Sequence, residues 1–221
     1  GDGSPGGYVS QPLESLLAII AIEAERAGCV VVGEDLGLVP DGFRDTLNAA
    51  GLYSYAVWQY EGRGDGSLLA PEALSAHSLA CFGTHDTPTL QGFWYGEDIA
   101  HWQRIGWLSD EAADQRHGER ATQRQSLRAH CGIGNTAGPS EISGAILKRL
   151  AEAPAALLAV QLDDALQVIE AQNMPGTVDE YPNWRRRMAI AVEDFAASKQ
   201  LARLNALMPA DRASVPDAPE S

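Results

Sequence analysis

The sequence predicts an α/β fold made of parallel strand and helix units. Short apolar runs rich in valine, leucine and alanine recur along the chain, and they have the length and composition of buried strands. Helical stretches or long connections separate these runs, as parallel neighbours require. The hydrophobic share of the 221 residues is 45%, which is enough for a sizeable core and excludes a wholly disordered chain.

The first part of the chain predicts a helix, a strand and a second helix. Leucine and isoleucine recur at helical spacing over residues 12–27, and Gly28 is a suitable C-terminal stop. The apolar run at residues 29–33 predicts a strand that is buried on both faces. An aspartate at the start and a glycine just beyond the end favour a second helix over residues 41–50.

The middle of the chain predicts two more strands and a helical region. Residues 53–60 are aromatic and β-branched, which favours a second strand, and residues 79–83 predict a third. Residues 96–131 are helical and charged in composition. Glycine, asparagine and proline mark residues 132–140 as a loop.

The last part of the chain is expected to complete the strand and helix alternation. Residues 142–151 predict a helix, residues 156–162 a fourth strand, and residues 182–207 a final helix. Residues 208–221 are rich in proline, alanine and aspartate and predict a disordered tail.

The charge balance indicates which classes of binding partner are unfavourable for this chain. Acidic residues outnumber basic ones by 30 to 16, so the formal net charge is −14. Such a surface repels phosphate backbones and anionic lipids, which argues against nucleic-acid or membrane binding as the main activity. A neutral small molecule or sugar fits this charge better.

The three cysteines indicate the redox compartment, and the first residues of the chain indicate whether a signal peptide is present. The cysteines lie far apart and form no CxxC pair, which favours free thiols in a reducing cytoplasm. No apolar run reaches the roughly 18 residues of a bilayer-spanning helix. The chain begins with glycine and has no signal peptide, so we expect it to start inside a longer protein.

Acidic side chains follow three of the four predicted strands. They are Glu34, Asp86 and the pair Asp163 and Asp164. In a parallel α/β barrel the ends of the strands converge on the active-site face, so these carboxylates are candidates for acid/base work on sugars. Acidic residues after strands also cap the helices that follow, and this structural alternative stays open for each of them.

The sequence predicts no metal site and no cofactor. Histidines elsewhere in the chain show no spacing with a carboxylate that is typical of zinc ligands. There is no phosphate-binding GxxxxGK[ST] motif, and the glycines around residue 64 do not follow the dinucleotide pattern.

Six motifs follow one another along the chain. They are Gly7-Tyr8-Val9, Val32-Gly33-Glu34-Asp35-Leu36-Gly37, Tyr53-Ser54-Tyr55-Ala56-Val57, Thr84-His85-Asp86-Thr87-Pro88-Thr89-Leu90, Asn173-Met174-Pro175-Gly176-Thr177 and Asn183-Trp184-Arg185-Arg186. In this order the series resembles the C-terminal half of the amylomaltases, the 4-α-glucanotransferases of glycoside hydrolase family 77, and particularly their bacterial maltose-utilising branch. The resemblance covers nearly the whole chain, from about residue 7 to residue 194.

The resemblance implies roles for three side chains. Glu34 matches the family's general acid/base, Asp86 matches the carboxylate that stabilises the transition state, and His85 matches a hydroxyl-binding histidine. A protonated glutamic acid can donate to the glycosidic oxygen and then deprotonate the acceptor sugar. An ionised aspartate favours the positive charge of an oxocarbenium-like state.

Two further residues are implied to bind substrate. Tyr60 stands where the family has an aromatic residue at the end of a barrel strand, which suggests stacking on an acceptor sugar; packing in the core is the alternative. Asn173 lies in the family's Asn-x-Pro-Gly-Thr loop beside the active site, and its alternative is a plain turn residue.

The resemblance implies that residues 1–207 are strands five to eight, with their helices, of a catalytic (β/α)₈ barrel. The family's nucleophile is an aspartate in an Arg-x-Asp-His context, which this chain lacks, so it would lie upstream of Gly1. The expected partner is the N-terminal half of the barrel, or a second copy that covers the open side of the fragment.

The implied reaction is the transfer of α-1,4-glucan segments between malto-oligosaccharides and glucose with retention. Two alternatives stay open. The isolated chain is a non-catalytic carbohydrate-binding half-barrel, or the protein is an α-amylase-type hydrolase, which fits residues 173–184 less well. An aspartate-bearing strand upstream of Gly1 would favour the transferase over the first alternative.

Overall fold

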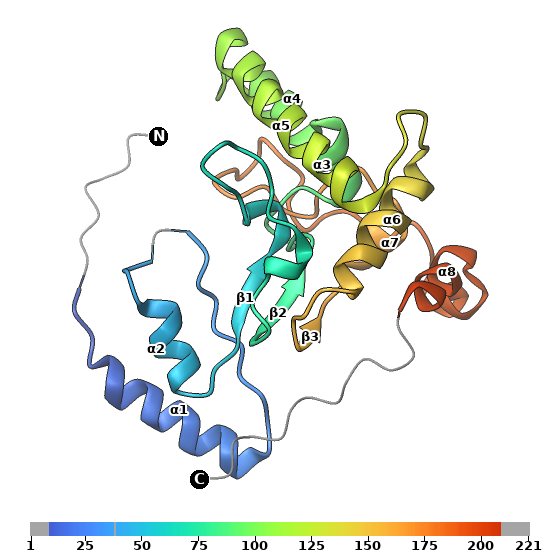
Figure 1. Cartoon of the computed structure of the whole chain (residues 1–221). Helices are drawn as coiled ribbons and strands as arrows, with labels where there is room; N and C mark the ends of the chain where they lie inside the picture. Colours follow the sequence, from blue (N-terminus) through green and yellow to red (C-terminus); the bar gives the residue numbers. More distant parts are fainter. Residues whose placement is uncertain (1–8, 38, 209–221) are drawn as a thin grey trace. The chain divides into compact units, whose positions relative to one another are not determined.

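The computed structural model describes residues 9–37 and 39–208 (Figure 1). These residues belong to two compact units, which adjoin in the sequence at Tyr55 and Ala56. The predicted disordered tail lies outside the described residues, apart from Met208.

The first unit is built around two helices. α1 (Leu13–Ala27) is confirmed, and Gly28 ends it with a φ of 59°, the left-handed conformation that glycine adopts most easily. α2 (Phe43–Ala49) starts later than predicted, because the residue at its N-terminal cap is a glycine rather than the expected aspartate. Both helices contribute leucines to one small buried cluster, Leu17, Leu47 and Leu52.

The predicted strand at residues 29–33 is reduced to a single parallel bridge between Val32 and Tyr53. Two backbone hydrogen bonds form it, from Gly33 N–H to the Tyr53 carbonyl at 2.8 Å and from Tyr53 N–H to the Val31 carbonyl at 2.9 Å. The expectation of burial on both faces is wrong, since Val30 is 50% exposed.

The described residues form a small sheet with the strand order β1-β2-β3, of which β2 and β3 lie wholly in the second unit. β1 (Ser54–Val57) and β2 (Ser78–Cys81) fall where two strands were predicted. β3 (Leu157–Leu158) is shorter than predicted and runs parallel to β2, with Leu79 opposite Leu157 and Ala80 opposite Leu158. The parallel pairing of β2 and β3 confirms the predicted α/β class.

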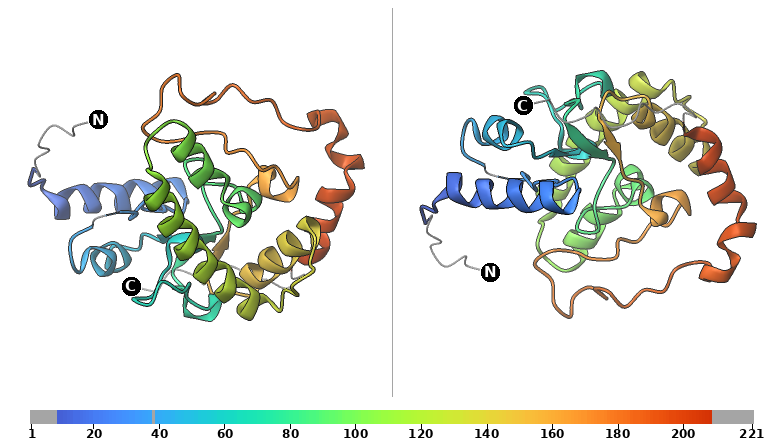
Figure 2. Two further views of the ribbon diagram at one scale, coloured as in Figure 1. Left: turned by 90° about the horizontal axis from the view of Figure 1, so that it is seen from above. Right: turned by 90° about the horizontal axis from the view of Figure 1, so that it is seen from below.

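Helices surround this sheet in the second unit. Among the described residues they are α3 (Leu90–Tyr95), α4 (Glu97–Arg104), α5 (Asp110–Cys131), α6 (Pro139–Ala151), α7 (Leu162–Ala165) and α8 (Lys199–Leu207). α5 runs along α4, and α8 lies beside α6, as the two views in Figure 2 show. α5 begins at Ser109, whose hydroxyl accepts from Ala112 N–H. The predicted helical region and the helix at 142–151 are therefore confirmed.

The core of the second unit lies between the sheet and helices α3, α5 and α6. Phe82, at the end of β2, packs edge-to-face against Trp58 and Phe93, with ring centroids 6.3 and 5.4 Å apart. Ile146 and Leu150 of α6 are fully buried in the same cluster. This packing fixes the ends of β1 and β2, from which the candidate site residues project.

The predicted final helix over residues 182–207 is wrong in its first half. Only α8 is an α-helix, preceded by a 3₁₀ helix at Val192–Ala197. Residues 183 and 184 are held by another loop instead: Asn183 binds the backbone of Met174 and Thr177, and Trp184 N–H donates to the Gln172 carbonyl. These bonds hold Trp184 at a φ of 58°, which is outside the range of a right-handed α-helix.

At Gly92, α3 lies in close contact with the chain after α7. Adding a single methyl group at this position should therefore lower the stability of the fold strongly. A Cβ at this position would lie 2.5 Å from the Ile169 carbonyl oxygen. We expect Gly92→Ala to lower the free energy of unfolding by about 1–3 kcal/mol, because the backbone has to move. Gly118→Ala is the control, since its Cβ meets nothing within 4 Å on a helix that alanine favours. Urea denaturation measures both, and equal midpoints would contradict the prediction.

Candidate functional site

The turn after β2 presents Asp86. Its backbone is fixed by threonine side chains: Thr84 N–H donates to Thr87 Oγ1 at 2.8 Å, and Asp86 N–H donates to Thr84 Oγ1 at 3.1 Å. Gln59, just after β1, donates to the same Thr87 hydroxyl at 3.0 Å. Buried hydrogen bonds therefore hold the loop at the ends of two neighbouring strands, as a site on the carboxyl edge of a sheet requires.

Two neighbours engage the Asp86 carboxylate, one on each oxygen. Asn173 Nδ2 donates to Oδ1 at 2.6 Å, and His85 Nε2 lies 3.2 Å from Oδ2. The Asp86 side chain is 47% exposed, and His85 is 63% exposed. Three residues predicted from distant parts of the sequence thus lie together around one accessible carboxylate.

The loop that carries Asn173 is itself anchored. Met174 N–H donates to Asn183 Oδ1 at 2.9 Å, and the Asn183 amide donates to Thr177 Oγ1 at 2.8 Å. The Thr177 hydroxyl donates to the Met174 carbonyl at 2.7 Å. Asn173 comes directly before the turn at residues 174–177, and its side chain donates to Asp86.

Tyr60 follows β1 in a 3₁₀ turn and is 59% exposed, so it is not a core residue. Partial burial of its ring and hydroxyl raises the pKa of Tyr60, and the negative charges of Asp98 and Asp86 add to this effect. The phenol thus stays protonated and available as a hydrogen-bond donor near Asp86.

Glu34 belongs to the first unit and is exposed, whereas the next residue, Asp35, is almost completely buried. Tyr55 N–H donates to Asp35 Oδ1 at 3.0 Å, and Arg44 Nε lies 2.6 Å from Oδ2. The two adjacent acids have different environments: Asp35 holds the segment in place, and Glu34 is the accessible carboxyl.

The third acidic group of the sequence analysis has a structural role. Asp164 is buried and its Oδ1 accepts from Leu90 N–H, at the start of α3, at 2.6 Å. Asp163 Oδ2 accepts from Gln172 Nε2 at 3.1 Å. Asp164 thus binds the first N–H of α3, and Asp163 binds the side chain of Gln172. Neither caps the helix that follows the predicted strand, which was the alternative considered for strand-end acids.

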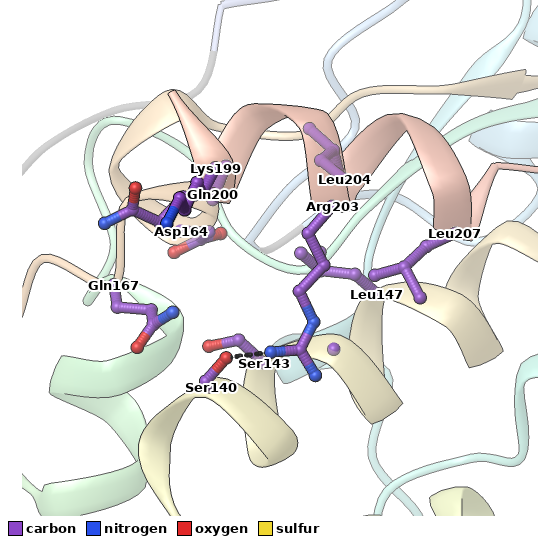
Figure 3. Close-up of a pocket in the computed structure, with 12 residues that line it drawn as sticks. Ser140, Ser143, Leu147, Asp164, Gln167, Lys199, Gln200, Arg203, Leu204 and Leu207 are labelled. Atoms are coloured by element: carbon purple, nitrogen blue, oxygen red, sulfur yellow. Dashed lines mark hydrogen bonds between the residues drawn. The ribbon is translucent and has the colours of Figure 1, made fainter. Parts of the chain in front are cut away.

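Asp164 also lines a cavity of about 190 Å³ between α6, α7 and α8. Figure 3 shows its carboxylate near Lys199 and Gln200, with Arg203 hydrogen-bonded to Ser140. The cavity that adjoins Asp86 and Asn173 is far smaller, about 30 Å³, which is room for a water molecule and not for a sugar ring. The larger cavity therefore lies away from the predicted site.

Burial of Asp164 predicts a pH dependence of stability. Burial raises the pKa of Asp164 from 3.8 to about 7, with a further contribution from Asp163. The folded chain thus holds this proton more tightly than the unfolded chain, so its stabilising effect is complete below pH 4 and is lost as the pH rises to about 7. At about 1.4 kcal/mol per tenfold change in proton affinity, the loss is about 4 kcal/mol.

Asp164→Asn should remove this part of the pH dependence, because the amide oxygen still accepts from Leu90 and carries no proton to lose. Urea denaturation at pH 4.5 and 7.5 measures the difference in unfolding free energy. Asp114→Asn, at an exposed position on α5, serves as the control and should follow the parent chain. Parallel profiles for the parent and Asp164→Asn would contradict the prediction.

Two residues near Asp86 were missed by the sequence analysis. Thr87, which fixes the Asp86 turn, carries no signal beyond its place two residues after His85. Trp184 was noted only as part of a motif, yet its ring contacts that of His85, with centroids 5.4 Å apart. The signal in the sequence is a tryptophan between an asparagine and three arginines, where a core residue is not expected.

Within residues 9–37 and 39–208, no three histidine, cysteine or acidic side chains are grouped so that they could hold a metal ion. In the same described part of the chain, no helix is long and apolar enough to cross a membrane.

This chain is similar in sequence to known 4-alpha-glucanotransferases. Residues 2–192 match the model of glycoside hydrolase family 77, described as 4-alpha-glucanotransferase. The chain is 35% identical over 196 residues to the 4-alpha-glucanotransferase of Haemophilus influenzae and 36% identical to that of Mycobacterium bovis. The matches cover 83% of this chain but only 28% and 27% of those proteins, so the chain spans less than a third of their length.

Solved structures agree with the sequence comparison. The amylomaltase from Corynebacterium glutamicum matches 90% of this chain and 31% of its own, with a TM-score of 0.80 and 26% identity. The amylomaltase from Streptococcus agalactiae in complex with acarbose has a TM-score of 0.64 at 20% identity, which shows a likeness of fold alone. Because the family model matches most of its length, this chain belongs to the 4-alpha-glucanotransferase family.

Proposed function

We propose that this chain forms part of a 4-α-glucanotransferase that moves α-1,4-glucan segments between malto-oligosaccharides and glucose with retention. The observation that carries the proposal is the exposed Asp86 carboxylate, bound on one oxygen by Asn173 and paired on the other with His85. The Asn173 amide and the His85 ring hold this carboxylate in one orientation. Such a carboxylate stabilises positive charge at a reacting sugar carbon.

In this proposal Glu34 and Asp86 have different tasks. Glu34, the exposed acid, donates a proton to the departing glycosidic oxygen and then takes one from the acceptor hydroxyl. Asp86 does not transfer a proton; its charge stabilises the oxocarbenium-like transition state. His85 and Tyr60 supply polar and aromatic groups for the sugar around it. The nucleophile is an aspartate outside these 221 residues.

The fold that follows from the family is the C-terminal half of a (β/α)₈ barrel, comprising residues 1–207. Its support is the parallel pairing of β2 and β3 and the structural likeness to an amylomaltase over 90% of the chain. In such a barrel Glu34, Tyr60 and Asp86 each follow a strand, which is where barrel enzymes carry their catalytic groups.

Disproportionation of maltotriose tests the proposed activity. The protein that carries this chain should convert maltotriose into glucose and longer dextrins, and NMR of the dextrins should show that the newly formed glycosidic bonds are α-linked. Release of glucose without longer dextrins would indicate a hydrolase instead. Formation of β-linked products would contradict retention.

A second candidate function is carbohydrate binding without turnover by the 221 residues alone. The observation that favours it is the absence of an Arg-x-Asp-His sequence from this chain, since double displacement needs a covalent glycosyl-enzyme. The purified chain should then bind maltotriose and form no dextrins. Turnover at a rate typical of enzymes would show that the nucleophile lies within the chain.

The apolar surface of α1 predicts self-association of the isolated chain. Leu16, Ile19, Ile20 and Ile22 are 38–58% exposed on this one helix. A patch of this kind is normally covered, by the rest of the barrel or by a second copy. The net charge of −14 opposes association, so raising the salt concentration should strengthen it. Light scattering across a salt series measures this, and Ile19→Lys should weaken it. A monomer at every salt concentration would contradict the prediction.

A further inference from the structure

Trp184 combines two features that are unusual for a tryptophan. Its side chain is 62% exposed, although tryptophan is a large ring that is highly buried on average. Its backbone has a φ of 58°, in the left-handed region that few residues other than glycine, asparagine and aspartate occupy. A residue in such a conformation persists only where the surrounding structure enforces it, and such residues gather at functional sites.

The bonds that enforce this conformation come from the Asn173 loop. Trp184 N–H donates to the Gln172 carbonyl at 3.0 Å. The preceding residue, Asn183, is fixed by hydrogen bonds to Met174 and Thr177. The same loop thus holds both the indole of Trp184 and the amide that binds Asp86.

The indole lies beside the polar groups of the candidate site. Its ring centroid is 5.4 Å from that of His85, with the two planes inclined by 47°. His85 Nε2 in turn lies 3.2 Å from Asp86 Oδ2. An accessible aromatic ring therefore lies next to an accessible imidazole and an accessible carboxylate.

We propose that Trp184 is a sugar-binding residue whose indole packs against the C–H face of a glucosyl unit while His85 and Asp86 bind its hydroxyl groups. A pyranose ring has an apolar face and a polar edge, so it needs both kinds of partner side by side. The cavity next to Asp86 is too small to enclose a sugar, and the ligand therefore lies across the open surface where the indole is exposed.

This inference rests on the proposed function, and its test separates the two. Calorimetric titration with maltotriose is carried out on Glu34→Gln, in which turnover is slowed, and on the same protein with a second substitution. Trp184→Leu and Trp184→Gly should bind maltotriose roughly 3- to 10-fold more weakly, and Trp184→Phe within about 2-fold of the parent. Tyr95→Leu, which removes another half-exposed aromatic ring, should leave the affinity unchanged.

Unfolding in urea distinguishes binding from packing. Glycine suits a φ of 58° better than tryptophan does, so Trp184→Gly should keep or gain stability while it loses affinity. Loss of stability in Trp184→Gly together with affinity would assign the residue a structural role and overturn the inference. Unchanged affinity in Trp184→Leu and Trp184→Gly would overturn it and leave the proposed function intact. No binding by the parent protein would overturn the proposed function itself.

Discussion

Replacement of Glu34 by glutamine in the protein that carries this chain is expected to lower the rate of transfer from maltotriose by about 10²–10⁴-fold. The amide has nearly the shape of the carboxyl but gives no proton to the leaving oxygen, so chemistry should slow while sugar binding stays within a few-fold. Initial rates of glucose release, with kcat and KM determined separately, measure the effect.

A comparison of two glycosyl donors tests whether Glu34 acts as the proton donor. A glucosyl fluoride needs little protonation of its leaving group, so its glycosylation step should be slowed far less than that of maltotriose. Glu25→Gln, on the exposed surface of α1, is the matched control and should behave as the parent protein. Equal losses with both donors in that step would assign Glu34 a structural role.

Replacement of Asp86 by asparagine is expected to lower kcat by about 10²–10³-fold with a smaller change in KM. The variant keeps an oxygen that accepts from Asn173, so the loop can stay in place while the negative charge is lost. Removal of a preorganised charge that acts mainly in the transition state costs kcat rather than ground-state affinity.

The contrast with glucosyl fluoride separates Asp86 from Glu34. A charge that stabilises the oxocarbenium-like state acts whatever the leaving group, so Asp86→Asn should slow both donors to a similar extent. Asp114→Asn on α5 is the control. If kcat for Asp86→Asn stays within about threefold of the parent, the proposed role of this carboxylate is wrong.

The elements that could be predicted from the sequence are those fixed by local rules. α1 follows from leucine spacing and a glycine stop, and β2 from a short apolar run. The segment after residue 182 could not be predicted in this way, because Asn183 and Trp184 are bound by residues about ten positions earlier. Helical periodicity contains no information about such tertiary partners.

Part of the candidate site could likewise be predicted from the sequence, and part could not. Asp86, His85 and Asn173 could be named from motifs, and the structure shows that they lie together. Which of two adjacent acids is buried could not be predicted: Asp35 binds Arg44 and the Tyr55 amide, and Glu34 is left exposed. Which of the two acids is buried depends on which side chain meets a partner from a distant segment. The pattern of a single sequence contains no information about such partners.

The bonds around Asp86 also have a consequence for how the chain folds. Asn173 is 87 positions from Asp86 in the sequence, and Asp164 is 74 positions from Leu90. Contacts over such separations form late, because the entropy of closing a long loop has to be overcome first. During synthesis from the N-terminus, β2 and α3 leave the ribosome well before the loop that completes them. Asp86 therefore acquires its bond from Asn173 only after most of the second unit has been made, and truncation before residue 173 removes this partner and leaves His85.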